Sequence, residues 1–596
     1  MQDDPPLLQP APPQFVGKSP VSAAVAILKV GWPMAISQAA YWVQNFVTIW
    51  LLGANGKKLA MAGYGLANVL CNVTGHCFLW GIGAGIDTLA SQAWGAKEHL
   101  AIGLINQRAL LILTLLVNVP VVAIWLNATP ILLACRQDPA VASQVGLFAR
   151  IRIPGLFAQG VVCCASKTLQ AMGKTRWLAV SNVLGIVLSV GLAWLFIAAS
   201  SPLSHYLSPI AGSALMSTLT DCVGALALLL VAVCDEDCRR CWPGWSAQCW
   251  RGWKPYLRLS VPAMLMGIFE WWSWDLVTFL AGLCPDPQTA LAANALLGSA
   301  IMAAYALPIG LQAGVQTLVG NALGAQSPRE ARLGAKVGGV LAICCMVAQC
   351  SLLYTFRRFW ASLFRAEPTV GKEVASLLRW TVFFCAGDGL QIVLTGVITG
   401  AGKQAVTTPI LCIAYWVLGL PLGALAAFSV PRNGLLGLWW GMTGAVWLHV
   451  LAYAAICFGA PPCIPFAIHW ADAARQAADR LAEPVAAGSG ANDGMTSALH
   501  RAAVAPLVVA DSQGTACCDG HVREERPNFQ SQAHAIAHVC ASSDVNTRGA
   551  SVFAHGTTNA KRSTSSSTST PASVSFSHER SNHRSIGTVQ RQPDTD

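Results

Sequence analysis

The chain has 596 residues, of which 54% are hydrophobic and only 11% are charged. Soluble domains carry about 25% charged residues, so this composition excludes an ordinary soluble protein and indicates an integral membrane protein. Basic loops beside a lipid surface explain the formal net charge of +10, which therefore does not by itself indicate nucleic-acid binding.

Twelve apolar stretches are long enough to cross a bilayer, which takes about 20 residues. In chain order they cover 27–52, 60–86, 103–126, 143–170, 177–200, 208–233, 256–283, 290–318, 335–356, 373–399, 405–428 and 434–458. The residues before the first stretch lack the basic-then-apolar order of a cleaved signal peptide. We therefore expect the first span to act as its own signal.

The two halves of this hydrophobic body match at a constant offset of 229 positions. The matched residues are Pro33 and Pro262, Thr88-Leu89 and Thr317-Leu318, Ala93, Gly95 and Ala96 with Ala322, Gly324 and Ala325, Gly173-Lys174 and Gly402-Lys403, and Gly212 and Gly441. An even-numbered unit repeated in tandem keeps its orientation in the membrane. We therefore predict an all-α polytopic protein with two six-helix lobes related by an axis along the membrane normal.

This repeat predicts five regions. They are a disordered tail over 1–24, an N-terminal lobe over 25–234, a cytoplasmic loop over 235–255, a C-terminal lobe over 256–460, and a mostly disordered cytoplasmic tail over 461–596. Within the last region, residues 470–480 predict a short juxtamembrane helix with Trp470 at the interface and its arginines facing lipid headgroups. The Ser- and Thr-rich run after it predicts a solvated tail.

Basic residues concentrate in the loops that share one side with both termini. Those loops carry Lys97, Lys174, Arg176, Arg239, Arg240, Arg251, Lys254, Arg329, Arg332, Lys336 and Lys403, and the opposite loops carry fewer. The positive-inside rule therefore predicts that both termini are cytoplasmic.

Most of the 21 cysteines fall inside spans, where cysteine behaves as a small hydrophobe. Only Cys238 and Cys241 have the spacing of a zinc half-site, and no second pair with that spacing accompanies them. We prefer reduced thiols to a metal site and expect no metal and no cofactor.

The central spans of the second half carry three acids that the first half lacks. Glu270 and Asp275 lie in span 7 and Asp388 lies in span 10, while the offset places Tyr41, Phe46 and Gln159 at the matching positions. An ionised acid at the centre of a span costs about 2.5–3.5 kcal/mol, so such acids are functional hypotheses. A carboxyl group removed from water also holds its proton more readily, as proton coupling requires. The plainer interpretation is neutral or hydrogen-bonded contacts between helices.

Five residues separate Glu270 from Asp275, which turns a helix by about 140° and directs the two side chains to different contacts. Tryptophans flank both acids, and an indole face attracts cations by about 0.5–2 kcal/mol. Carboxylate and indole together would suit an organic cation, with Trp271 the strongest candidate because it adjoins Glu270. For any single tryptophan, packing or lipid contact is the plainer interpretation.

Two acids of the first half remain without an assigned role. Asp221 lies within span 6, and Asp87 near the cytoplasmic end of span 2 suggests a gate or a helix-end contact. A complete P-loop, a HExxH motif, a GxSxG motif and a plausible catalytic triad are all missing from the sequence. We therefore expect a protein that is not an enzyme and does not use ATP directly.

Several motifs together resemble the multidrug and toxic compound extrusion (MATE) family in its eukaryotic branch. They are Trp32-Pro33, Asn72-Val73-Thr74-Gly75, Asp87-Thr88-Leu89-Ala90-Ser91-Gln92-Ala93-Trp94-Gly95-Ala96, Glu270-Trp271-Trp272, Pro308-Ile309-Gly310-Leu311, Gly320-Asn321-Ala322-Leu323-Gly324-Ala325 and Thr395-Gly396-Val397-Ile398-Thr399-Gly400-Ala401-Gly402-Lys403-Gln404, within about 25–480. The resemblance implies an antiporter with two lobes in a V, which expels cationic drugs or metabolites in exchange for protons, or for sodium in some members.

The resemblance also implies roles for particular residues. Glu270, Asp275 and Asp388 match the acids that couple transport and bind cations in the C-terminal lobe of eukaryotic members. We expect substrate to be lined by Trp271, Trp274, Asn72, Gln38 and Tyr305. Ser299 replaces a further glutamate of animal members, which leaves the cation site with one charge fewer and puts the substrate range in doubt. Trp274 replaces a usual tyrosine, which enlarges the aromatic wall.

Two other activities stay open at this stage. Export of an anionic or neutral metabolite would need a basic residue at mid-bilayer, and Lys167 is the candidate for it. A channel or non-transporting scaffold is the third alternative. We expect a monomer in the plasma membrane or in a vacuolar or lysosome-like membrane, without nucleic-acid partners.

Overall fold

The computed structural model describes residues 19–54, 58–198, 206–242, 244–363, 368–429, 433–459 and 464–486. Every regular element in these ranges is helical. Most of the predicted tails lies outside the described residues, as does the Ser- and Thr-rich run. All statements below concern the body of the chain, residues 19–486.

Six spans form the first lobe. Span 1 is α1 (Pro20–Ala54), span 2 joins α2 (Lys58–Cys71), η1 (Asn72–His76) and α3 (Cys77–Gly95), and span 3 joins α4 (His99–Ile112), η2 (Leu113–Asn118) and α5 (Val119–Leu126). Spans 4 to 6 are α7 (Pro139–Ala171), α8 (Thr175–Ile197) and α9 (Pro209–Cys234), and the short α6 (Ala128–Ala134) precedes α7.

Six spans also form the second lobe. They are α11 (Trp253–Ala281), α12 (Pro287–Gly324), α13 (Pro328–Thr355), α15 (Pro368–Ala401), the run of α16 (Gln404–Cys412), η5 (Ile413–Gly419) and α17 (Leu420–Phe428), and α18 (Leu435–Phe458). The short α14 (Arg357–Leu363) begins 229 residues after α6, so the repeat extends to the loops. Between the lobes lie α10 (Glu236–Cys241) and η4 (Ala247–Trp250).

Eleven of these helices are apolar and long enough to cross a membrane by composition alone. The twelfth, α11, has 29 residues but carries the acids and polar tryptophan edges of span 7, which lower its hydropathy. Its length and its place between flanking spans make it a membrane helix of the same fold. The predicted two sets of six helices are therefore confirmed.

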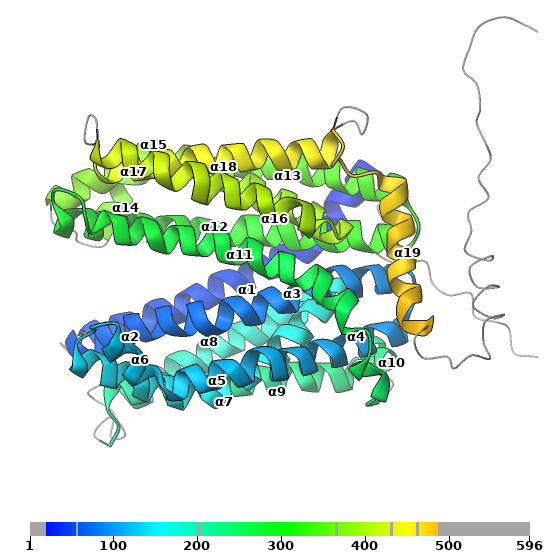
Figure 1. Ribbon diagram of the computed structural model, residues 1–596, viewed down its shortest axis with the longest axis horizontal. Helices are drawn as coiled ribbons and strands as arrows, with labels where there is room; N and C mark the ends of the chain where they lie inside the picture. Colours follow the sequence, from blue (N-terminus) through cyan, green and yellow to red (C-terminus); the bar gives the residue numbers. More distant parts are fainter. Residues whose placement is uncertain are drawn as a thin grey trace, which may run out of the picture. The chain divides into compact units, whose positions relative to one another are not determined.

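Figure 1 shows the two lobes as separate layers of near-parallel helices. Each lobe has its own apolar core, but the first helix of each lobe crosses to the other. The start of α1 contributes Ala23 and Ile27 to the core of the second lobe, and the start of α11 contributes Tyr256 to the core of the first. Accordingly α1 packs on α12 and α11 packs on α3.

The lobes meet closely at the end of the molecule where α3 and α12 terminate. A Cβ on Gly95 would overlap the carbonyl oxygen of Asn321, and a Cβ on Gly324 would overlap that of Gln92. The two glycines are repeat partners, and so are the two residues whose carbonyls they approach. Only glycine allows the backbones to approach this closely, so the repeat builds one symmetric crossing.

Hydrogen bonds between the lobes follow the same symmetry at this end. The Thr88 hydroxyl donates to the Thr399 carbonyl over 2.6 Å, and the Thr317 hydroxyl donates to the Gln170 carbonyl over 3.1 Å. The Gln92 amide donates to the Gly400 carbonyl over 3.0 Å. These bonds hold the two lobes together at this end, which we call the closed end.

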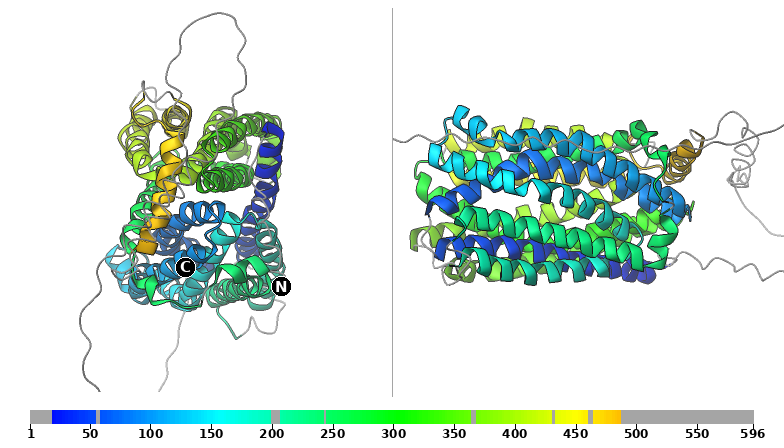
Figure 2. Two further views of the ribbon diagram at one scale, coloured as in Figure 1. Left: turned by 90° about the vertical axis from the view of Figure 1, so that its right-hand side faces the viewer. Right: turned by 90° about the horizontal axis from the view of Figure 1, so that it is seen from below.

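The closed end is also crossed by α19 (Trp470–Ala486), which lies nearly at right angles to the spans (Figures 1 and 2). Its alanines Ala473, Ala474 and Ala477 are buried in the core of the second lobe, whereas Leu481 packs against the core of the first. Arg480 donates to Gln92 of α3. The expectation that the arginines of this helix face lipid headgroups is therefore wrong for Arg480, because both lobes supply its acceptors.

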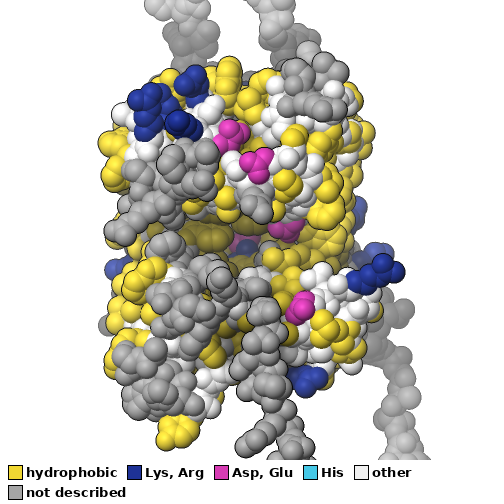
Figure 3. Space-filling view, turned by 90° about the vertical axis from the view of Figure 1, so that its left-hand side faces the viewer, with side chains coloured by type: hydrophobic (Ala, Val, Ile, Leu, Met, Phe, Trp, Pro, Cys, Tyr) yellow, Lys and Arg dark blue, Asp and Glu magenta, His cyan; other side chains and the backbone are white. Residues whose placement is uncertain are grey.

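At the opposite end the lobes separate. Figure 3 looks onto that end and shows a hollow between the two lobes, with acidic side chains visible in its depth. The described structure is thus closed at the α19 end and open at the other, which we call the open end.

Candidate functional site

Two acids of the second lobe share one amide donor. The Gln391 side-chain nitrogen donates to a Glu270 carboxylate oxygen over 2.8 Å and to an Asp388 carboxylate oxygen over 3.2 Å. Gln391 lies three residues after Asp388 on α15, so both side chains leave the same face of that helix. Glu270 reaches them from α11. The structure therefore joins two of the three predicted acids into one site.

The surroundings of the acid pair are aromatic. Tyr305 on α12 lies close enough to Glu270 for the two side chains to interact electrostatically. The Trp271 ring meets the Tyr305 ring edge to face, with their centroids 6.0 Å apart. Glu270, Tyr305 and Trp271 therefore form one continuous wall beside Asp388. An aromatic face next to carboxylates is the arrangement that attracts organic cations.

Asp275 is not part of this site. It is exposed on α11, and it lies close enough to Cys77 of α3 in the other lobe for the two side chains to interact electrostatically. As the five-residue separation predicts, the side chains of Glu270 and Asp275 point to different contacts in the structure. Asp275 therefore faces the first lobe rather than the Glu270 and Asp388 pair.

The other expected lining residues differ in their positions. Trp274 packs against Phe384 and Trp439 within the aromatic core of the second lobe. Asn72 begins the π-helical segment of span 2, and Gln38 lies on α1; both are half-buried. Among the described residues, no hydrogen bond joins Asn72 or Gln38 to the acid pair. Tyr305 and Trp271 are thus the aromatic residues that the structure brings to the acids.

A buried polar cluster extends from the acid pair into the second lobe, and sequence reasoning missed it. Tyr415, His449 and Tyr453 contact one another through their rings, at centroid distances of 5.9 and 3.9 Å. The Tyr415 hydroxyl and both ring nitrogens of His449 are buried without a hydrogen-bond partner among the described residues. Tyr415 lies in the π-helical segment η5, and such segments occur often at functional sites.

The acids of the first lobe have basic partners. Asp221 pairs with Arg152 of α7 and accepts a 2.7 Å hydrogen bond from Gln159, the repeat partner of Asp388. Asp87 pairs with Lys167 over 2.5 Å. In contrast, Glu270 and Asp388 lie in no ion pair with the described residues. The lobes thus differ in charge: the first holds neutral pairs, and the second holds two acids with only neutral donors.

Arg152 is a further buried polar residue that the sequence analysis did not identify. It lies within span 4, and its side chain is only 7% exposed. A search of the spans for both signs of charge would have found it, because an arginine in an apolar stretch needs a partner as much as an acid does. Arg152 and Lys167 both have acid partners, so neither presents an unpaired positive charge to an anionic substrate.

Metal binding has little support in the described ranges, where no three His, Cys, Asp or Glu side chains gather closely enough to hold an ion. Cys238 and Cys241 both lie on α10, outside the spans. Burial, reinforced by repulsion from nearby aspartates, raises the pKa of each thiol to about 12.

A known family model matches this chain twice, once in each half of the repeat. The MatE family model matches residues 33–195 and again residues 262–425, which together make more than half of the chain. The chain belongs to the MatE family. The two matches begin 229 residues apart, at Pro33 and Pro262, so each lobe is one copy of the family unit.

Individual relatives agree with this assignment. Multidrug and toxin extrusion protein 1 of Danio rerio is 32% identical over 438 residues, which cover 73% of this chain and 72% of that protein. Protein DETOXIFICATION 16 of Arabidopsis thaliana is 29% identical over 450 residues, which cover 75% of this chain and 88% of that protein. The crystal structure of the eukaryotic MATE transporter AtDTX14 has the same fold, with a TM-score of 0.70 and 24% identity over 78% of this chain and 99% of that one.

MatE proteins are membrane transporters that export xenobiotic compounds, and this chain is a multi-pass transporter of that family. The resemblance found in the motifs is therefore confirmed. The two-lobed fold and its twelve spans are confirmed as well.

Proposed function

We propose that this MatE protein is an antiporter that exports organic cations in exchange for protons, with Glu270 and Asp388 holding either species in turn. The observation that carries the proposal is the pair of carboxylates that shares the Gln391 amide and has no basic partner among the described residues. Two close carboxylates whose only hydrogen-bond donors are neutral are stabilised when a proton or a cation lies between them. The adjacent Trp271 and Tyr305 rings suit an organic cation rather than a small ion alone.

The proposed cycle places the α19 end in the cytoplasm, following the positive-inside rule. The state described here then opens outward, and protons arriving from outside neutralise the acids and release the cation. The protonated form returns to an inward-open state, where loss of the protons restores the site. The difference in affinity between the two protonation states is what drives the cycle, because a ligand shifts a conformational equilibrium only by differential binding.

Transport in proteoliposomes tests this function. With an imposed pH gradient, the wild-type protein should accumulate a fluorescent organic cation, and collapse of the gradient should stop the uptake. Glu270→Gln and Asp388→Asn should each reduce uptake at least about tenfold, because each removes a charge that binds cation and proton alike. Glu236→Gln is the matched control, since Glu236 is an exposed acid of α10 whose partner is Arg240.

Three outcomes would contradict the proposal. Equal uptake by the wild-type protein and by both acid variants would remove the acid pair from coupling. Uptake driven by a sodium gradient but not by a pH gradient would replace the proton by sodium. Preferred uptake of an organic anion under the same conditions would replace the substrate class.

A further inference from the structure

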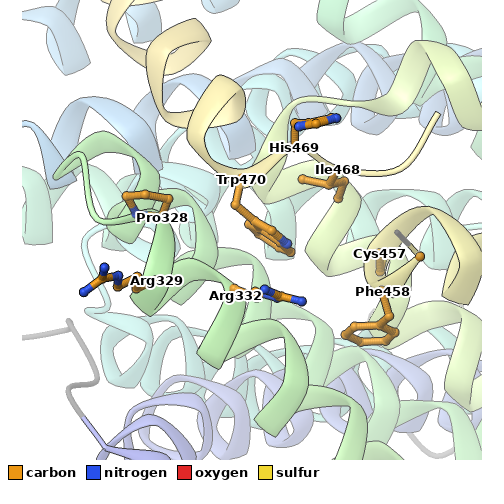
Figure 4. Close-up of a pocket in the computed structure, with 9 residues that line it drawn as sticks. Pro328, Arg329, Arg332, Cys457, Phe458, Ile468, His469 and Trp470 are labelled. Carbon is orange, nitrogen blue, oxygen red and sulfur yellow. The ribbon is translucent and has the colours of Figure 1, made fainter. Parts of the chain in front are cut away.

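A second cavity lies at the closed end, far along the spans from the acid pair. Its volume is about 280 Å³, slightly smaller than most ligand pockets. It forms where α13 begins, α18 ends and the chain turns into α19 (Figure 4). Its lining residues are Pro328, Arg329, Arg332, Cys457, Phe458, Gly459, Ile468, His469 and Trp470.

The lining contains basic residues and no acid. Arg329 and Arg332 form no ion pair with the described residues. The nearest acid on α19, Asp472, is bound to Arg475 over 2.8 Å. Figure 4 shows the Arg332 side chain reaching toward Phe458 beneath the Trp470 ring. The cavity therefore offers unpaired positive charge to an anionic group.

The other half of the lining is apolar. Phe458, Ile468 and Trp470 form one wall, and Phe458 remains 41% exposed at the end of its span. Just beyond the cavity, Phe466 is 65% exposed. Apolar and aromatic side chains beside arginines at the end of a span are typical of the lipid headgroup region. Basic pockets between spans on the cytoplasmic side are places where anionic lipid headgroups bind.

We propose that this cavity binds the phosphate-bearing headgroup of an anionic lipid, with Arg332 on the phosphate, Arg329 adding positive charge at the rim, and Phe458 and Trp470 against the acyl chains. The proposal rests on the orientation proposed above, which places the closed end at the cytoplasmic leaflet, where such lipids gather. A soluble phosphate compound would use the two arginines but would gain nothing from the apolar wall. The lining thus favours a lipid over a free anion.

Binding there has a consequence for α19. Ile468, His469 and Trp470 belong to the cavity, and the same segment leads into the helix whose Arg480 contacts both lobes. Arg480 donates to Gln92 of the first lobe and to the Gly402 carbonyl of the second. A lipid held between Arg332 and Trp470 fixes the start of α19 and so supports its bridge across the closed end.

Lipid titration of the purified full chain tests the site without any transport reaction. Short-chain phosphatidylinositol 4-phosphate is added in detergent, and binding is read by native mass spectrometry and by the shift in melting temperature. The wild-type protein should bind and gain thermal stability. Arg329→Gln with Arg332→Gln should weaken binding at least about tenfold, because charge-assisted bonds to phosphate are lost. Arg176→Gln should bind like wild type, since Arg176 is exposed at the start of α8 and lies outside the cavity.

Equal binding by the wild-type and double-variant proteins would overturn the site. Inositol 1,4-bisphosphate binding as tightly as the lipid would overturn the lipid as ligand and leave a soluble phosphate site. A photoactivatable phosphoinositide on the wild-type protein provides a measurement that needs no variant. Its cross-links should map to the first turns of α13 and α19, and cross-links confined to other helices would contradict the proposal.

Discussion

The ion pair between Arg152 and Asp221 is the best-defined charge contact inside the first lobe. Both side chains are at least 87% buried, and Gln159 satisfies the second oxygen of the aspartate. Removing one partner of a buried pair leaves an uncompensated charge and costs about 3–5 kcal/mol. Replacing both partners by apolar residues costs far less.

Asp221→Asn should therefore lower the melting temperature of the purified protein clearly, whereas Arg152→Met combined with Asp221→Leu should restore most of it. Asp275→Asn is the control, because Asp275 is exposed and has no ion-pair partner among the described residues. If Asp221→Asn is no less stable than Asp275→Asn, the pair does not carry this structural role.

The Lys174 contact with α10 gives a pH prediction. Lys174 pairs with Asp235 and with Asp237, the latter over 2.7 Å. Burial alone would raise the pKa of Asp235, but its bonds with Lys174 and the Cys238 amide lower that pKa overall. Burial alone would lower the pKa of Lys174, but the two aspartates raise it overall. The stability from Asp235 is lost only below about pH 4, and that from Lys174 only above about pH 10.

Hydrogen exchange of residues 235–241, corrected for the intrinsic rate, should therefore show constant protection from pH 5.5 to 8.5. Lys174→Gln should lower that protection at every pH in the range. A change of protection across this range in the wild-type protein would contradict the assignment. Constant protection would leave the acid pair as the source of any pH effect on transport.

How far the sequence predicts the site depends on the type of residue. Glu270 and Asp388 could be found because an acid in an apolar span is costly wherever it points. Gln391 and His449 could not, because polar neutral residues and single histidines occur in spans for many reasons. Only the folded structure shows that Gln391 meets Glu270 and that His449 meets Tyr415. Arg152 could be predicted as well, because a basic residue in an apolar span needs a partner as an acid does.

At the scale of helices, the glycine crossing of α3 and α12 decides which end is closed. A Cβ at Gly95 or Gly324 would overlap a carbonyl oxygen of the other lobe. Overpacking of this kind costs about 1–3 kcal/mol, which changes the ratio of two states by about five- to 160-fold. The cost falls only on the state in which the closed end is shut.

Gly95→Ala and Gly324→Ala should therefore shift the protein toward a state open at the α19 end. Spin labels on the first turns of α4 and α13 should lie farther apart in these variants, as measured by pulsed electron paramagnetic resonance. Gly298→Ala is the matched control on α12, because nothing lies within 4 Å of its added methyl. Unchanged distances in both variants would show that the crossing does not limit opening.

Composition predicts the twelve spans, but it does not predict which spans pack against one another. Hydropathy predicts where α1 and α11 cross the membrane, and the offset predicts that they are equivalent. Neither predicts that each helix packs into the core of the opposite lobe, because both faces of a membrane helix are apolar and pattern alone does not select a neighbour. The same limit applies to α19, whose alanine face packs against protein rather than lipid.

In the whole molecule, the repeat builds the same helical framework in both lobes, and the charged residues make the two lobes different. Matched glycines and threonines close one end symmetrically, as Gly95 and Gly324 illustrate. Unmatched acids give the second lobe the uncompensated pair, while Arg152 and Lys167 neutralise the acids of the first. The central claim is that Glu270 and Asp388 hold protons or an organic cation, but not both at once.

Proton release on substrate binding tests that claim most directly. An organic cation is titrated into the purified protein by calorimetry near neutral pH, in buffers of different ionisation enthalpy. The account predicts that the wild-type protein releases protons as the cation binds, and that the combined Glu270→Gln and Asp388→Asn variant releases none. Cation binding by the wild-type protein without any proton release would contradict it.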